Sequence, residues 1–199
     1  MNHWVSVWAN AMSIVDAKPE SYSKNITLRY PILMSFTGNK IRITLDNFTG
    51  TDSVTFNQVT IAKTINTKEI DVSTLKQVTF NQNSSLTLQP GENQISDEIE
   101  IDVEKGEFLT VSIYCKDFTQ MRCGVTTIGP LSKAFYAIGN QCEEAKLPRD
   151  FYKEIVWFYF LSRVDVYTDS KNKAILCYGD SITAQNWPEE LQLKLMENN

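Results

Sequence analysis

Short runs of alternating apolar and polar residues fill the chain from about Asn25 to Cys115. In residues 40–45 every second side chain is apolar, and a turn-forming cluster follows at residues 47–52. Further runs at this spacing are Val54/Phe56, Val59/Ile61, Ile70/Val72, Val78/Phe80, Leu86/Leu88, Ile99/Ile101/Val103 and Leu109/Val111/Ile113. A period of two predicts β-strands, and the Gly, Pro, Asn and Asp residues between the runs predict turns.

Strands that are apolar on one face must bury that face against a second layer. One-sided alternation also excludes a parallel sheet, whose strands are usually apolar on both faces. The pattern therefore predicts a mainly β fold, an antiparallel β-sandwich of jelly-roll type. Its predicted core includes Ile41, Ile43, Leu45, Val111 and Ile113.

Beyond Cys115 the pattern becomes irregular, up to an aromatic block at residues 157–160. Such a block is usually part of a core, although exposed Trp and Tyr rings also form carbohydrate-binding platforms. Trp4 and Trp8 are open to the same two interpretations. A polar segment at residues 168–173 marks a boundary, which predicts one domain over 1–168 and the start of another over 169–199.

The pattern changes after this boundary. Residues 174–178 form a continuous apolar run, which is typical of a buried parallel strand. Gly179, Asp180 and Ser181 follow as a tight turn. A helix is predicted from about Trp187, because Asn186 is a good N-cap and acidic residues fill the first turn. The predicted order is strand, turn and helix.

A serine between a buried strand and a helix lies where α/β enzymes place reactive groups. Gly179 permits close backbone approach, and nearby amides can stabilise the negative charge of a tetrahedral intermediate. The alternative is that Asp180 and Ser181 only form the entry to a helix, where both residue types are favoured. These residues alone do not decide between the two interpretations.

The block Gly179-Asp180-Ser181-Ile182-Thr183 is similar to the first block of the GDSL, or SGNH, hydrolases. Three other segments resemble the subgroup that carries an N-terminal β-sandwich domain, namely the Trp-rich residues 4–9, residues 39–51 and residues 157–166. Arg163 departs from the glycine expected in the last of these. The resemblance spans nearly the whole chain and implies a β-sandwich followed by the first strand, turn and helix of an α/β SGNH hydrolase domain.

The resemblance implies a carboxylic ester hydrolase that acts through an acyl-enzyme on Ser181, with a small-molecule or glycan ester as substrate. Ser181 would be the nucleophile and a backbone oxyanion donor, while Asp180 and Gly179 would support the turn. The asparagine block and the Asp-x-x-His pair of the family have no counterpart in the sequence. We therefore expect a truncated hydrolase domain that is incomplete for catalysis, because serine needs a positioned base.

Two other hypotheses come from the same observations. The chain could be a non-catalytic β-sandwich module that binds carbohydrate or a partner, or a truncated fragment of the hydrolase whose apolar strand drives self-association or awaits a complementing chain. The only histidine, His3, precedes the β region and lies outside any family motif. Nothing in the sequence marks it as the missing base.

The composition of the chain limits the classes of partner that it could bind. The formal net charge of -5 leaves no basic surface for nucleic acid. No run is long enough for a membrane span, and no basic n-region precedes an apolar stretch, which predicts a cytoplasmic protein. The four cysteines form no C-x-x-C pair, so no metal, redox centre or other cofactor is expected.

Overall fold

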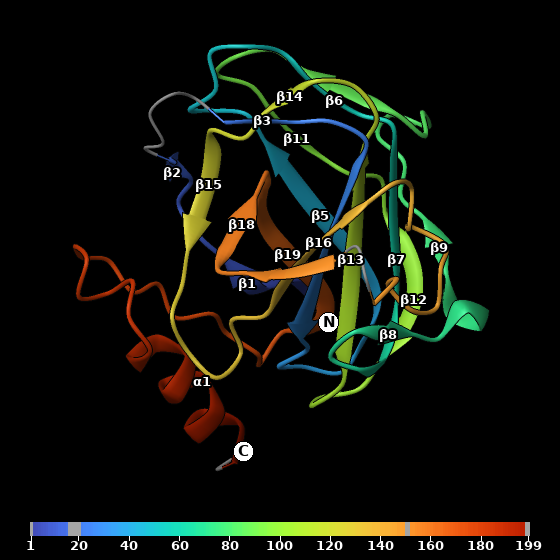
Figure 1. Ribbon diagram of the computed structural model, residues 1–199. Coiled ribbons are helices and arrows are strands. Elements are labelled where there is room, and N and C mark those ends of the chain that lie inside the picture. Colours follow the sequence, from blue (N-terminus) through green and yellow to red (C-terminus); the bar gives the residue numbers. More distant parts are fainter. Residues whose placement is uncertain (1, 16–20, 150–151, 198–199) are drawn as a thin grey trace.

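The computed structural model describes residues 2–15, 21–149 and 152–197. These residues form nineteen strands, one 3-10 helix and one α-helix, and every strand pair is antiparallel (Figure 1). The prediction of a mainly β, antiparallel fold is confirmed. We call residues 2–169 the β body and residues 170–197 the C-terminal arm.

Two large sheets make up most of the β body. The first has the order β1 (Asn2–Ala9), β19 (Leu161–Asp169), β5 (Gly38–Asp46) and β11 (Asn93–Ile95), and β12 (Ile99–Val103) also pairs with β5. The second has the order β17 (Tyr152–Ile155), β16 (Ala134–Ile138), β4 (Ile26–Leu33), β13 (Phe108–Cys115), β7 (Gln58–Asn66) and β8 (Glu69–Ile70), and β9 (Lys76–Gln77) also pairs with β7.

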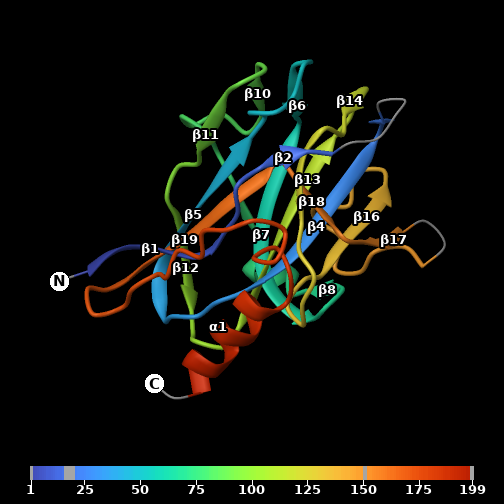
Figure 2. The same ribbon diagram turned by 90° about the vertical axis from the view of Figure 1, so that its left-hand side faces the viewer.

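Three small sheets complete the β body. β10 (Leu86–Leu88) pairs with β6 (Val54–Phe56), and β14 (Thr119–Gln120) pairs with β3 (Tyr22–Ser23). The third joins β18 (Trp157–Tyr159), β15 (Cys123–Thr126) and β2 (Ser13–Ile14). Figure 2 shows β10, β6 and β14 at one end of the large sheets and the helix α1 (Trp187–Glu197) near the other.

Both large sheets contribute to one hydrophobic core. Ile41, Ile43 and Leu45 of β5 and Val111 and Ile113 of β13 all have 0% of their surface exposed, as the alternation predicted. Burial of these faces removes apolar surface from water, which is the main favourable contribution to folding. Three predicted strand positions are wrong. Val72 lies in a 3-10 helix, η1 (Val72–Thr74), and is half exposed. Val78 and Phe80 are buried but lie outside the named strands, with Phe80 in an isolated bridge to Asn83.

The aromatic block at residues 157–160 belongs largely to the core. Phe158 and Phe160 are buried, whereas Trp157 and Tyr159 are only partly covered. Phe158 packs against Tyr30 with ring centroids 5.0 Å apart, and the Tyr30 hydroxyl accepts a hydrogen bond from the backbone N–H of Tyr159 at 2.8 Å. The interpretation of the block as core is confirmed for the two phenylalanines.

Asp97 holds a strained turn on the surface. Its carboxylate accepts hydrogen bonds from the Thr79 hydroxyl at 2.6 Å and from the backbone N–H groups of Asn81 and Gln82 at 3.2 and 2.7 Å. Asn81 and Gln82 both have positive φ, at 51° and 66°. The hydroxyl and backbone donors lower the pKa of Asp97, because they stabilise the ionised form.

We expect Asp97→Asn to lower the Tm at pH 7 by about 3 °C, after allowing for solvent screening of this half-exposed group. A lowered folded-state pKa contributes stability above the unfolded value, and that contribution is lost as pH falls through the folded pKa. The difference in Tm between wild type and variant should therefore vanish in strong acid. Differential scanning calorimetry at pH 7 and near pH 2 measures it, with the exposed Asp102→Asn as control. A difference that grows on acidification would contradict this role.

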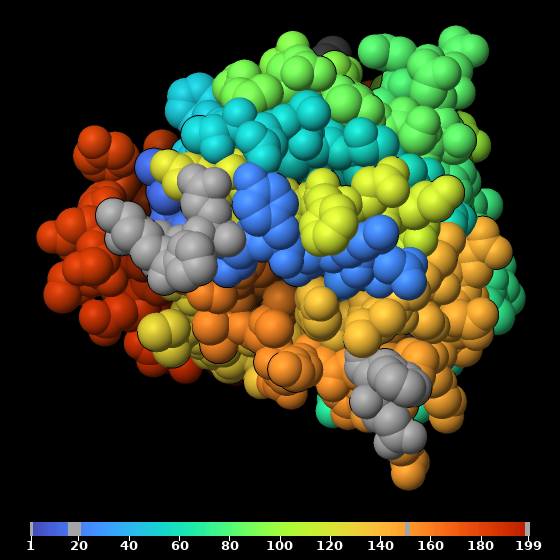
Figure 3. Space-filling model, turned by 45° about the horizontal axis from the view of Figure 1, so that its top comes forward, coloured from blue at the N-terminus to red at the C-terminus, as the bar shows by residue number. Residues whose placement is uncertain are grey.

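The C-terminal arm departs from the sequence prediction at its first part. The helix begins at Trp187 as predicted, but residues 174–178 form no strand. Ile175, Leu176 and Tyr178 are 64%, 88% and 97% exposed. A parallel strand makes its backbone hydrogen bonds only with neighbouring strands, and in the described part of the chain none pairs with this segment. The apolar run lies at one side of the β body, with the rest of the arm (Figure 3).

Candidate functional site

The predicted nucleophile segment forms a turn with a defined backbone. The Asp180 side chain accepts a hydrogen bond from the N–H of Ile182 at 3.0 Å, and the Asp180 carbonyl accepts one from the N–H of Thr183 at 3.0 Å. A side chain at Gly179 would collide with the Thr183 hydroxyl. Asp180 thus closes this turn with its side chain and its backbone, and Gly179 lies against the Thr183 side chain.

Ser181 lies at the exposed tip of this turn, and the structure records no hydrogen bond to its hydroxyl. The indole N–H of Trp187 donates to the carbonyl of Ile182 at 3.1 Å, which ties the turn to the start of α1. The helix itself begins at Trp187, so its first-turn amides follow the turn and do not belong to Ser181. In the described part of the chain, no recorded hydrogen bond joins Ser181 to a side chain that could act as its base.

His3, the only histidine in the sequence, is held at the base of the arm. It lies on β1, and its ring nitrogen Nε2 is 3.2 Å from the carbonyl oxygen of Asn172. Asn172 in turn donates from its side chain to the Thr168 hydroxyl at 2.7 Å. These contacts connect His3 to the junction of arm and β body, and the described hydrogen bonds do not bring it to Ser181.

The cysteines provide no alternative nucleophile within the β body. Cys115, Cys123 and Cys142 are buried free thiols, and Cys177 on the arm is partly exposed. Burial raises the pKa of Cys115 and of Cys142 to about 12, because the charged thiolate is disfavoured away from water. Among the residues that the structure describes, no group of three His, Cys, Asp or Glu side chains could hold a metal ion.

Aromatic and charged side chains gather on the outer face of the first sheet. Trp4 lies beside Tyr167 with ring centroids 5.3 Å apart, and the Arg42 guanidinium is 4.5 Å from the centre of a Trp4 ring. Arg42 also pairs with Asp165 at 2.9 Å, and Asp165 accepts a hydrogen bond from the Ser6 hydroxyl at 2.6 Å. Cation–π and ionic contacts thus fix a partly exposed aromatic pair.

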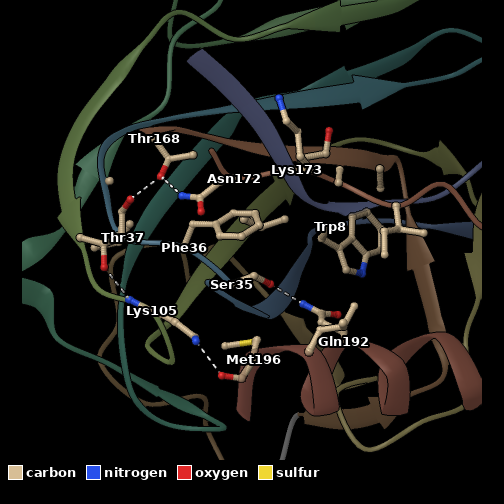
Figure 4. A pocket seen from close by; sticks show the side chains of 18 of the residues that line it. Trp8, Ser35, Phe36, Thr37, Lys105, Thr168, Asn172, Lys173, Gln192 and Met196 are labelled. Carbon is tan, nitrogen blue, oxygen red and sulfur yellow. Dashed lines mark hydrogen bonds between the residues drawn. The ribbon is translucent and has the colours of Figure 1, made fainter. Parts of the chain in front are cut away.

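A cleft of about 1500 Å³ separates the arm from the β body, and no pattern in the sequence predicted it. Trp8 of β1 and Phe36, in the connection between β4 and β5, lie on the β-body side, and Figure 4 shows both rings beside the open space. Leu191 and Leu195 of α1 line the opposite wall. A helical spacing of four residues could have predicted an apolar face on α1, but not what that face would meet.

Several hydrogen bonds join α1 to the β body. The Gln192 side chain donates to the Ser35 hydroxyl at 2.7 Å, and the Lys105 ammonium donates to the carbonyl of Met196 at 2.6 Å (Figure 4). At the first turn the Glu189 carboxylate accepts hydrogen bonds from the N–H of Leu131 at 2.7 Å and from the Ser132 hydroxyl. No described residue of α1 is fully buried.

Comparison with known proteins leaves the site to be interpreted from its own geometry. None of the described helices has the length and apolar character needed to cross a membrane. No protein-family model matches the chain, and no curated protein sequence matches it either. Function is therefore inferred from the turn at Ser181, the cleft and the outer face of the first sheet.

Proposed function

We propose that the chain carries the nucleophile segment of an SGNH-type carboxylic ester hydrolase, with Ser181 as the nucleophile. The observation that carries this proposal is the exposed Ser181 at the tip of a turn that Asp180 fixes from within and Trp187 ties to α1. A nucleophilic serine must be accessible to its substrate on a defined backbone. In this turn Ser181 is exposed, and hydrogen bonds from the neighbouring residues define the backbone around it.

In the proposed reaction the Ser181 Oγ attacks the ester carbonyl carbon and gives up its proton to a base. The tetrahedral intermediate collapses to an acyl-enzyme, and the base returns the proton to the departing alcohol. Water then releases the acid by the same steps. The Ser181 backbone N–H is one oxyanion donor. We infer that the base and the remaining donors come from a polypeptide segment that pairs with residues 174–178.

The exposed apolar run supports this inference. Three large apolar side chains, Ile175, Leu176 and Tyr178, are exposed on a segment that pairs with no strand among the described residues. Exposed apolar segments with free backbone groups are sites for pairing with further strands. The addition of such strands would convert the run into the parallel strand that its sequence favours, with Ser181 at its carboxyl end.

The β body serves in this proposal as an accessory domain, a jelly-roll-like sandwich over residues 1–168 ahead of a hydrolase segment over 169–199. Support comes from the two large antiparallel sheets, which share a single core. A second candidate function, a carbohydrate- or partner-binding module without catalysis, is favoured by the partly exposed Trp4 and Tyr167 beside Arg42. Planar rings on a sheet face can stack against sugar rings.

The proposal predicts that prolonged incubation with an excess of a fluorophosphonate probe labels the purified chain at Ser181 only slowly, because the base is missing, and that Ser181→Ala removes this adduct. Peptide mass spectrometry locates the adduct, and Ser170→Ala on the same arm is the control. Hydrolysis of p-nitrophenyl acetate should stay at least about 10⁴-fold below that of a complete serine hydrolase, because both acylation and deacylation need the missing base.

If the Ser181→Ala variant were labelled as strongly as the wild type, Ser181 would not be the nucleophile. Absence of labelling together with retention of the chain on a glycan column would favour the binding module instead. If the wild-type chain hydrolysed p-nitrophenyl acetate fast and Ser181→Ala abolished this activity, Ser181 would still be the nucleophile. The need for a base from another segment would then be contradicted.

A further inference from the structure

The cleft between arm and β body has two apolar walls that face each other across open space. Val7, Trp8, Phe36 and Val103 line the β-body side. Pro188, Leu191, Leu195 and Met196 line the helix side. Trp8 and Phe36 pack against the main core from behind, with Trp8 5.2 Å from Phe158, so this wall is rigid. Facing apolar walls in water are a favourable site for an apolar ligand.

The polar contacts of α1 keep these walls apart. Glu189 is bound at the first turn, Gln192 near the middle and the Met196 carbonyl at the last turn. Closing the cleft would require these hydrogen bonds to break or shift. The free energy gained from contact between the apolar side chains would be offset by the free energy lost with the hydrogen bonds. These hydrogen bonds therefore set the distance between the helix and the β body, and the cleft results from that distance.

Charge at the rim of the cleft is balanced. Its charged lining residues are three basic ones, Lys105, Lys171 and Lys173, and three acidic ones, Asp102, Glu104 and Asp169. Such a lining gives no strong preference for a cation or an anion. The apolar side chains on both sides of the cleft then favour a flexible aliphatic chain.

We propose that this cleft binds an unbranched aliphatic chain, and that in the reaction it holds the acyl group of the ester. Cys177 and Thr183, which flank the Ser181 turn in the sequence, both line the cleft. A chain in the cleft can therefore lead toward the nucleophile. The acyl identity rests on the function proposed above, whereas chain binding itself does not require Ser181.

Isothermal titration of the full chain with 1-butanol, 1-hexanol and 1-octanol tests the proposal. Each buried methylene contributes a constant increment, so affinity should rise about fifteenfold for each pair of methylenes added. Binding with a stoichiometry of one is expected, and Ser181→Ala should bind equally well. Affinity that does not depend on chain length would overturn the proposal.

Two variant pairs locate the binding. Leu191→Gln should weaken octanol binding about fivefold, while Leu193→Gln on the same helix, outside the cleft, should change it less than twofold. Ala9→Trp, which fills the cleft from an exposed position, should weaken binding more than fivefold, with the exposed Ala184→Trp as control. If the two variants of either pair changed the octanol affinity equally, the ligand would bind outside the cleft.

The outcomes also separate this proposal from the function of Ser181. If the chain bound octanol but the probe did not label Ser181, the proposed hydrolase function would be wrong and the proposal of a chain-binding cleft would stand. If the probe labelled Ser181 but octanol binding could not be measured, Ser181 would stand as the nucleophile. The proposal that the cleft holds the acyl group would be wrong.

Discussion

Arg29→Ala should lower the free energy of unfolding by about 4 kcal/mol, and the Tm by about 12 °C. Arg29 is completely buried in β4 and donates from Nη2 to the carbonyls of Gln141 and Glu144 at 2.6 and 2.8 Å. Weaker bonds of 3.3 Å run to the Lys68 carbonyl and the Ser112 hydroxyl. Burial lowers the pKa of Arg29 to about 10, which reflects how dry its surroundings are.

The magnitude follows from what the substitution leaves behind. Alanine removes a large side chain from a filled interior and leaves at least two buried carbonyl groups without donors, each with a desolvation penalty of about 1–3 kcal/mol. Because these carbonyls belong to residues 141–144, the loop over the second sheet should also exchange its amide hydrogens faster. Hydrogen exchange with mass spectrometry measures that change.

Urea denaturation of Arg29→Ala, Arg29→Lys and the exposed Arg149→Ala provides the comparison. Arg29→Lys should fall between the other two, because one ammonium cannot reach all of the carbonyls that a guanidinium fork reaches. A loss in Arg29→Ala no larger than that in Arg149→Ala would show that the guanidinium does not support the loop.

Phe160→Gly should be more stable than Phe160→Ala, the reverse of the usual order. Phe160 is fully buried, with its ring 5.3 Å from that of Phe56, yet its φ is 64°. Its carbonyl accepts from the N–H of Asp46 and its N–H donates to the carbonyl of Cys123, which fixes this conformation between β18 and β19. Both variants should lose about 3–5 kcal/mol of stability with the ring.

The inverted order has a backbone origin. A positive φ places the Cβ atom of an L-residue in conflict with the backbone at a cost of about 1–2 kcal/mol, and glycine avoids that conflict. Phe158 is the matched control, since it is equally buried but does not have a positive φ. Phe158→Gly should therefore be less stable than Phe158→Ala. The same order at both positions in urea denaturation would contradict the strain at Phe160.

Much of the β body was predictable because its signals are local. Alternation at residues 41–45 and 109–113 specifies both a strand and its buried face, since successive side chains point to opposite sides of a sheet. The start of α1 was likewise predictable from Asn186 and the acidic first turn. The position of the turn at Ser181 follows from Asp180, whose short side chain bonds to a backbone N–H two residues ahead.

Other features required the tertiary structure because they depend on distant residues. Arg29 lies on the face of β4 that alternation assigns to solvent, and only the covering loop at 141–144 turns it into a buried group. The conformation of Phe160 is set by Asp46 and Cys123. The apolar run at 174–178 has the composition of a strand, but a strand exists only when neighbours accept its hydrogen bonds.

The sequence by itself thus determined the antiparallel β class, its core positions, the helix at Trp187 and the chemical candidate Ser181. Each depends on periodicity or on contacts within a few residues. The tertiary structure decided that Ser181 is exposed, and that hydrogen bonds join α1 to the β body across a cleft with apolar side chains on both sides. Those properties arise from pairs such as Ser35 and Gln192, which lie far apart in the chain and meet only on folding.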